Sequence, residues 1–374
     1  MRYYWSLDLL RFVSAFLVLL FHIAAFGGGA PSWPVDAAAA PLGWLTPVSW
    51  FGWVGVQVFF VLSGFIISAS AYDSTALDFL RKRAIRVFPA LWISAVLALV
   101  VRAIWGEPLA DLVPDLLRSA ILSPKGPYID GVVWSLVIEA IFYAGVAAVI
   151  LVAPRFGGLA RSLTLAAFAL GIASTCFNLV HWLAVSGIAL PGPAGMPASL
   201  QSFAFDVLLL RHGVLFAVGI LLYQIVQHRP SPHLVGGLAL FTAAGALQIA
   251  NKAHAGLAGA IPVAFWLAGI LVIYLGARFG SRAFAQRLRP IMRPIGLMTY
   301  PLYLNHFVLG QALLPVLALF ISNSLVLAVV LCAIILANAW FIARFPERWL
   351  QRIARTVLFR PSAAPVGRPA LEKS

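Results

Sequence analysis

Ten separate runs of apolar residues, each long enough to cross a bilayer as a helix, constrain what this chain can fold into. Of its 374 residues, 62% are hydrophobic and only 10% are charged, which leaves no room for a large soluble domain. We therefore predict an all-α polytopic membrane protein, a bundle of about ten transmembrane helices. The predicted spans lie near residues 8–26, 50–71, 87–105, 131–153, 160–183, 203–227, 234–250, 256–276, 294–315 and 322–343.

The distribution of basic residues over the predicted loops indicates the orientation of the bundle. If the N-terminus is cytoplasmic, the loops on its side carry twenty Lys and Arg, whereas the opposite loops carry only three, Arg118, Lys125 and Lys252. Cytoplasmic loops of membrane proteins collect basic residues, so we predict an N-in and C-in topology. The net charge of +14 then needs no nucleic-acid partner. We expect one membrane domain, residues 1–349, and a basic cytoplasmic tail, residues 350–374, that is disordered at its end.

The first span contains three polar side chains that hydrocarbon disfavours. It reads "LDLLRFVSAFLVLLFHIAAFG" and carries Asp8, Arg11 and His22. Asp8 and Arg11 are three residues apart, so they can pair on one helix face. Arg11 and His22 are eleven residues apart, a spacing that directs both side chains to the same face, about 16 Å apart along the axis. A lone buried histidine is usually structural, but an arginine on the same stripe favours a functional track.

Two later spans add polar residues at a similar depth. The fourth span holds Glu139 in "VVWSLVIEAIFY", and this carboxyl group either pairs with Arg211 or Arg11 for structure alone or orients a catalytic base. The ninth span contains "MTYPLYLNHFVL", which places Tyr303 and His306 on neighbouring parts of one helix.

A basic cluster follows the second span, in "FLRKRAIRVFPALW". Its cations are Arg81, Lys82, Arg83 and Arg86, and we expect them in a cytoplasmic loop, with Pro89 in the first turn of the next helix. Such a cluster fixes topology and attracts anionic lipids. Because arginine binds phosphate oxygens bidentately, the cluster also predicts a site for a phosphorylated ligand.

Taken together, these blocks resemble the membrane acyltransferase-3 family. The resemblance rests on the Arg-x10-His spacing of the first span and on "GVQVFFVLSGFIIS", "RKRAIRVFPALW", "WSLVIEAIFY" and "YPLYLNH", which occur in the family's order. Each motif alone is weak, but jointly they are specific. The resemblance implies a bacterial inner-membrane enzyme that moves an acyl group, usually acetyl, from cytoplasmic acyl-CoA to a hydroxyl of an extracytoplasmic glycan or related acceptor.

The resemblance also implies roles for individual residues. Arg11 and His22 match the family's essential pair, Glu139 matches the acid of its "WSL..E" motif, and Arg81, Arg83 and Arg86 match its basic loop. One common form of the family adds a C-terminal esterase-like domain, which we do not expect here because the sequence ends soon after the tenth span.

These residues suggest a reaction scheme, which we state as a hypothesis. Phosphates of acetyl-CoA or another acyl-CoA bind the Arg81–Arg86 cluster, and the thioester reaches His22, which acts as a base or becomes acylated. Glu139 or His306 orients His22, and a cell-envelope glycan or lipid-linked saccharide accepts the acyl group. No metal is expected, because Cys176 and Cys332 lie in separate apolar runs without metal-ligand spacing.

A second function remains open at this stage. Polar residues along a track would also serve a transporter or flippase of a glycan or an organic anion. Transporters more often show internal repeats and paired broken helices, and the sequence shows neither clearly.

The charge asymmetry generates a prediction about topology. With Cys176 and Cys332 replaced by alanine, a cysteine introduced at Ala38 should react with an impermeant thiol reagent in intact cells, and one at Ala84 should not. The reverse labelling pattern would exclude the N-in orientation.

Overall fold

The computed structural model of the protein describes residues 3–25, 42–186, 200–228, 230–253 and 257–359, and within these ranges it is helical, without strands. In this described part, nine helices are long and apolar enough to cross a membrane. A shorter apolar helix, Gly213–Gln227, brings the number of spans to about ten. The predicted fold class is therefore confirmed, while the N-in orientation stays a prediction.

The helices follow one another in the order of the predicted spans. Their bounds are α1 (Trp5–Ala25), η2 (Gly43–Leu45), α2 (Thr46–Ser49), α3 (Val54–Tyr72), α4 (Ala76–Ile104), α5 (Leu109–Ala120), α6 (Val133–Val152), η3 (Ala153–Phe156), α7 (Leu159–Val185), α9 (Ala204–Val207), α10 (Gly213–Gln227), α11 (Pro232–Lys252), α12 (Leu257–Phe279), α13 (Arg282–Ala318), α14 (Ser324–Arg344) and α15 (Pro346–Leu358). Helix α15 runs across residue 350, the predicted start of the tail, and the predicted disordered end, residues 360–374, lies outside the described residues.

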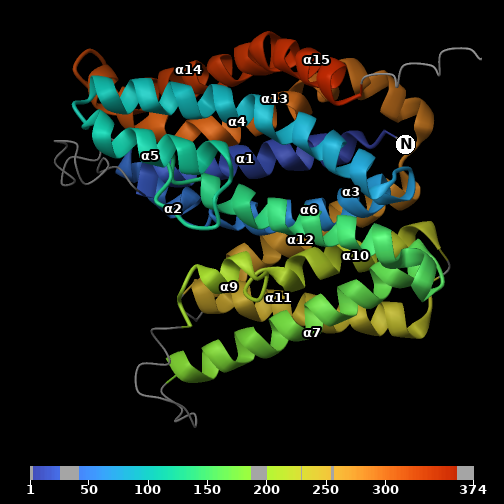
Figure 1. The fold of residues 1–374 in the computed structure, drawn as a ribbon. Coiled ribbons are helices and arrows are strands. Elements are labelled where there is room, and N and C mark those ends of the chain that lie inside the picture. Colours follow the sequence, from blue (N-terminus) through green and yellow to red (C-terminus); the bar gives the residue numbers. More distant parts are fainter. Residues whose placement is uncertain (1–2, 26–41, 187–199, 229, 254–256, 360–374) are drawn as a thin grey trace, which may run out of the picture.

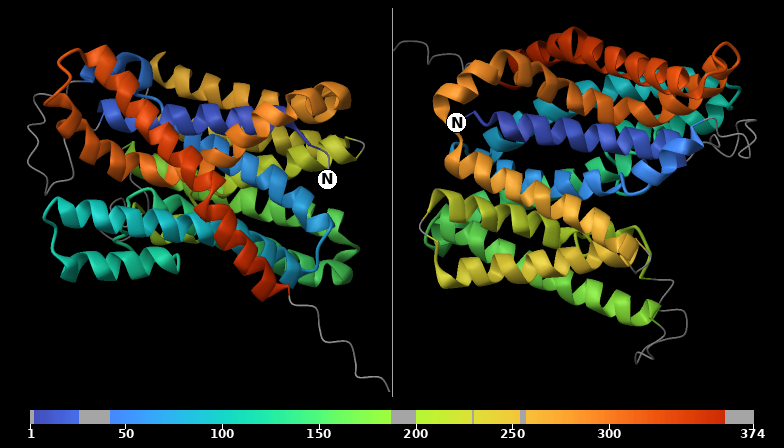
Figure 2. Two further views of the ribbon diagram at one scale, coloured as in Figure 1. Left: turned by 90° about the horizontal axis from the view of Figure 1, so that it is seen from above. Right: turned by 180° about the vertical axis from the view of Figure 1, so that it is seen from behind.

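Helix α3 lies at the centre of the bundle. In Figure 1, α1, α4, α13 and α14 lie on one side of it and α7, α10 and α11 on the other. Helix α3 contacts α1, α6 and α10, so it joins the two groups. Seen from behind in Figure 2, α1 runs between α13 and α3, and it contacts both. Other helices therefore cover the first helix on these two sides, while Leu9 and Val13 remain exposed.

Glycines allow α3 to approach its neighbours closely. A Cβ atom on Gly64 of α3 or on Gly219 of α10 would overlap the backbone of the facing helix. Gly52 and Gly55 lie in the same way against the backbone of α1. Because lipid supplies no hydrophobic force between helices, such close backbone contacts are a main source of helix association.

The basic cluster lies on a helix and not in a loop, which corrects our expectation. Helix α4 begins at Ala76, and Thr75 caps it by accepting a hydrogen bond from the Asp78 amide at 3.2 Å. Pro89, expected in the first turn, lies inside this helix. One proline removes a single backbone hydrogen bond, which a helix inside a bundle tolerates. Arg81, Lys82 and Arg83 therefore project from one turn of this helix, and Arg86 projects from the next.

The sixth predicted span is also different, because it is broken. Helix α9 ends at Val207, Leu209 has a positive φ of 60°, and α10 begins only at Gly213. The Arg211 carbonyl in the break accepts hydrogen bonds from Asn178 Nδ2 at 3.0 Å and Gln248 Nε2 at 2.8 Å. Side chains of α7 and α11 thus satisfy the backbone that the break exposes, as a non-helical segment within a membrane requires.

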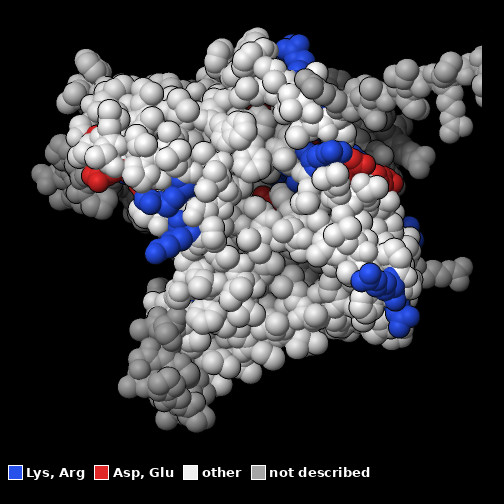
Figure 3. All heavy atoms as spheres, in the orientation of Figure 1, with Lys and Arg blue, Asp and Glu red and all other residues white. Residues whose placement is uncertain are grey.

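The surface matches a protein embedded in lipid. On the face shown in Figure 3, charged side chains form separate clusters, and most of the surface between them carries no charge. Exposed apolar residues follow one another along single helix faces, as Trp92, Val96 and Val100 do on α4.

The glycine contact between α3 and α10 generates a stability prediction. Gly219→Ala should destabilise the protein by about 1–3 kcal/mol, because its methyl group meets the backbone of α3 and forces the helices apart. Gly145→Ala in α6 is the matched control, since a Cβ there meets no atom within 4 Å. Thermal unfolding in detergent should show a lower midpoint for the first variant only, and equal midpoints would contradict the close contact.

Candidate functional site

The bundle has two ends that differ chemically. We call the end where α1 begins, with Arg81–Arg86 and α15, the basic end, and the end where α1 finishes, beyond His22, the histidine end. Three cavities lie between them, and their lining residues come from helices far apart in the sequence.

The charge pair of the first helix lies at the basic end. Arg11 Nη1 donates to Asp8 Oδ1 at 3.0 Å, so the predicted pairing is confirmed. Asp8 is 4% exposed, and its carboxylate lies against Gly296 of α13, where any side chain would overlap it. The absence of a side chain at Gly296 thus makes room for the carboxylate that balances Arg11.

The basic-end cavity has a volume of about 260 Å³. Besides Arg11, Lys82, Arg83 and Arg86, it is lined by Arg293 from α13 and Arg355 from α15. Sequence reasoning missed these last two arginines as site residues. The sequence marks them only as topology signals, because nothing local in it places them beside α4.

The cations of α4 make different contacts. Arg86 Nη1 pairs with Glu347 Oε1 of α15 at 3.2 Å, and Arg83 Nη2 donates to Ser70 Oγ at 3.2 Å. Arg81 instead pairs with Asp78 at 3.4 Å, its guanidinium lies over the Phe359 ring, and it does not line the cavity. The structure therefore separates Arg81 from the other three predicted residues.

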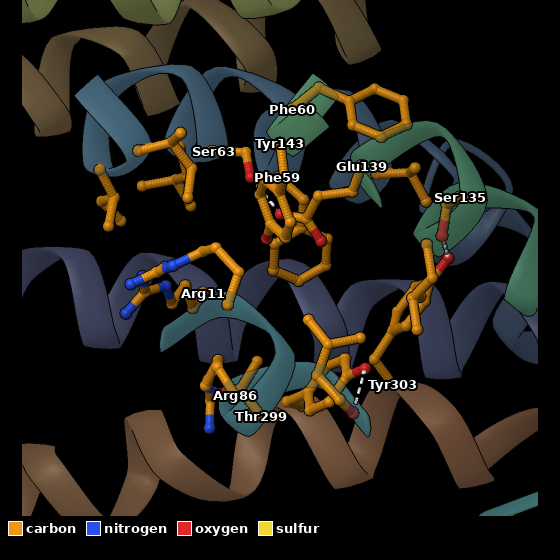
Figure 4. A pocket seen from close by; sticks show the side chains of 18 of the residues that line it. Arg11, Phe59, Phe60, Ser63, Arg86, Ser135, Glu139, Tyr143, Thr299 and Tyr303 are labelled. Carbon is orange, nitrogen blue, oxygen red and sulfur yellow. Dashed lines mark hydrogen bonds between the residues drawn. The ribbon is translucent and has the colours of Figure 1, made fainter. Parts of the chain in front are cut away.

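The central cavity, about 140 Å³, lies deeper in the bundle. Figure 4 shows that Arg11, Ser63, Glu139 and Tyr303 line it from four different helices. The Glu139 carboxylate accepts a hydrogen bond from the Ser63 hydroxyl, and Arg211 pairs with Asp206 instead. Glu139 therefore belongs to the cavity wall opposite Arg11.

The Tyr303 side chain closes the far side of this cavity. Its hydroxyl lies 2.7 Å from Ser135 Oγ, and Tyr303 and Val56 line both the central cavity and the next one. These two side chains form the boundary, which we call the neck, between the central and the histidine-end cavities.

The histidine-end cavity, about 240 Å³, contains His22. It is also lined by Trp53, Gln57, Trp134, Lys252 and Phe307. The sequence predicts His22 as a site residue but none of these five. The two tryptophans in particular carry no signal, because tryptophan near the end of a span is common in any membrane protein.

His22 lies beside a second histidine. His22 Nδ1 lies 2.9 Å from His306 Nε2 and 2.9 Å from the Val18 carbonyl, and His306 Nδ1 lies 2.8 Å from the Tyr303 carbonyl. Carbonyl oxygens only accept, so we assign the proton of each ring to Nδ1. The single proton on His22 Nδ1 is then shared between the Val18 carbonyl oxygen and His306 Nε2, and the basic nitrogen of His22 is Nε2. The structure brings His306, and not Glu139, into contact with His22.

The three cavities adjoin one another in order. Arg11, Arg83, Arg86 and Gly296 line both the basic-end and the central cavities, and the two side chains of the neck line both the central and the histidine-end cavities. Arg11 thus lines the first two cavities and His22 the third, while His306 is fully buried behind His22 and lines none of them.

Comparison with known proteins identifies this arrangement. A family model described as an acyltransferase domain, acyltransferase 3, matches residues 4–344, nearly the whole chain. The chain belongs to the acyltransferase-3 family. This acyltransferase matches no curated protein and no solved structure.

Family membership decides between the two functions that the sequence left open. The protein is a membrane-bound acyltransferase, and an acyltransferase requires an acyl donor. The resemblance read from the five sequence blocks is confirmed.

Proposed function

We propose that this acyltransferase transfers an acetyl group from cytoplasmic acetyl-CoA to a hydroxyl of a cell-envelope glycan or lipid-linked saccharide, across a bacterial inner membrane. The observation that carries the proposal is the order of three adjoining cavities, from a basic end suited to phosphates to an imidazole suited to base catalysis. The excess of predicted cytoplasmic cations supports the side on which the donor binds.

The basic-end cavity suits the phosphates of coenzyme A. Lys82, Arg83, Arg86, Arg293 and Arg355 line it together with Arg11, against a single carboxylate that lines it, Asp8. Phosphate groups bind arginine through charge-assisted, bidentate hydrogen bonds. The pantetheine arm then extends through the central cavity, and the thioester reaches the neck beside Tyr303.

His22 acts as the general base at the neck. Its Nε2 takes the proton of the acceptor hydroxyl as the oxygen attacks the thioester carbonyl carbon. The resulting tetrahedral oxyanion needs a hydrogen-bond donor, and the Tyr303 hydroxyl at the neck supplies one by turning its proton from Ser135 Oγ, 2.7 Å away, toward the oxyanion. When the C–S bond breaks, the sulfur receives the proton from His22 Nε2, which leaves the ester and free coenzyme A.

His306 positions His22 for this step. Together with the Val18 carbonyl oxygen it accepts the hydrogen bond from His22 Nδ1–H, which fixes the ring tautomer and leaves Nε2 as the base. The same bond favours the imidazolium that forms when Nε2 takes a proton. Glu139 does not contact His22; its carboxyl group accepts a hydrogen bond from Ser63 and lines the path of the pantetheine arm, on the cavity wall opposite Arg11.

The donor site is tested by changing the cations that line the cavity. Arg83→Ala combined with Arg86→Ala should raise the KM for acetyl-CoA about tenfold or more, because hydrogen bonds to charged groups contribute about 1.5–3 kcal/mol each. Acetyl-CoA consumption by purified protein with a glycan acceptor measures this, and it also tests the proposed function itself.

Arg81→Ala is the matched control for the double variant. Arg81 lies on the same helix but outside the cavity, so its loss should leave the KM unchanged. An unchanged KM in a correctly inserted double variant would show that the cluster does not bind the donor and serves only to orient the protein and attract anionic lipids.

The histidine pair generates a prediction about turnover. His22→Ala should lower kcat by about 10²–10⁴-fold, the usual contribution of general base catalysis, while the protein still binds coenzyme A. Arg11→Lys should also impair turnover, because lysine keeps the charge but loses the planar fork.

To test whether His306 positions His22, the experiment must separate the loss of the hydrogen bond from the loss of packing. His306→Gln keeps a hydrogen-bond acceptor for His22 Nδ1–H, so it should retain more turnover than His306→Ala, with coenzyme A binding equal in both. His181→Ala in α7 serves as the control, since its ring stacks on Phe177 away from the cavities.

For the His22→Ala variant, near wild-type turnover in folded protein would show that His22 is not the general base.

A further inference from the structure

The histidine-end cavity has the walls of a sugar site. Trp53 from the start of α3 and Trp134 from the start of α6 line it beside His22. Small-molecule sites combine large apolar walls with a few polar groups that fix orientation. A sugar ring matches such a site, because it has apolar C–H faces and hydroxyls around its edge.

A buried amide in this cavity lacks a partner. Gln57 is 3% exposed, and its Oε1 atom has no hydrogen-bond partner within the described residues. Buried polar atoms are almost always satisfied, so an unsatisfied acceptor beside a cavity indicates a ligand that donates. Neighbouring hydroxyls of a sugar fit here, one donating to Gln57 and the next to His22.

The cavity also carries a positive charge. Lys252 Nζ lies 4.5 Å from the centroid of the Trp53 ring, and no carboxylate of the described chain forms an ion pair with it. The nearby Asp206 is engaged by Arg211 at 2.8 Å and His212 at 3.1 Å. Arg118, by contrast, pairs with Asp115 at 2.7 Å. The ammonium group of Lys252 is thus available to an anionic ligand.

We propose that the histidine-end cavity binds a sugar residue of the acceptor and selects one with an anionic substituent, which pairs with Lys252 while Gln57 accepts from a hydroxyl next to the reacting one. The inference rests on the proposed function, since it assigns the acceptor side of that reaction. It narrows the acceptor to acidic or phosphorylated saccharides.

Thiol protection tests this without any acyl donor. Gly131 lines the cavity and is exposed, and a Cβ there makes only ordinary contacts with Phe307, so Gly131→Cys adds a reporter thiol. Cys176→Ala and Cys332→Ala remove the background thiols of the described chain. The rate of modification by N-ethylmaleimide is then measured with increasing methyl glucuronide or methyl glucoside, and with glucose 6-phosphate or glucose.

The anionic member of at least one pair should protect at about tenfold lower concentration than its neutral partner, a difference of about 1.4 kcal/mol. Lys252→Gln should abolish this preference, and Gln57→Leu should weaken protection by both members. Lys125→Gln, a change of the same kind on the same predicted side but outside the cavity, should leave the preference intact.

Equal protection within both pairs, no protection by any sugar, or a preference that survives Lys252→Gln would each overturn the inference. Because the assay needs no turnover, its failure is independent of acetyl-CoA consumption. A failure of the proposed function would in turn leave the protection pattern unchanged.

Discussion

The charge of Arg11 within a hydrocarbon-spanning helix is the constraint around which this protein is arranged. Placing such a charge at the centre of a bilayer helix costs about 2.5–3.5 kcal/mol unless it is balanced and kept from lipid. Asp8 supplies the balance at 3.0 Å, Gly296 leaves the space for Asp8, and α3 and α13 cover the helix on either side. The same enclosure that shields the charge creates the interior surface that the cavities occupy.

Close helix contacts and internal space occur together in this bundle. The glycine contacts of α3 with α1 and α10 hold the backbones together at two crossings. Ser63, which directly precedes Gly64 in the sequence, lines the central cavity together with its hydrogen-bond partner Glu139. A helix that is fixed by backbone contacts can hold polar side chains toward a cavity without rearranging, which is the preorganisation that a reaction centre requires.

Periodic and local signals in the sequence were enough to predict the approximate positions of the spans, the Asp8–Arg11 pair and the shared helix face of Arg11 and His22. They depend on the helix repeat alone. The contact between His22 and His306 joins residues 284 positions apart, and Arg293 and Arg355 reach the basic end from α13 and α15. No periodicity encodes such encounters, which follow from how the helices pack.

The start of α4 and the break before α10 were missed for a different reason. Each depends on a single cap or backbone conformation, at Thr75 and at Leu209. The cap could have been predicted from the sequence, because a threonine three residues before an aspartate is typical of a helix N-terminus. The break was not, because it is stabilised by Asn178 and Gln248 from other helices.

On the proposed mechanism, the order of the cavities explains how a transfer across the membrane avoids moving the whole donor. The cations remain at the basic end, so the phosphates of coenzyme A stay where their charges are compensated. Only the thin arm and the neutral acyl group need to reach the neck at Val56 and Tyr303. A charged phosphate at the neck would lack these partners and would pay the desolvation cost that Arg11 avoids by pairing with Asp8. Arg11 and the other cations of the basic end thus also set how far the phosphates of the donor can enter the bundle.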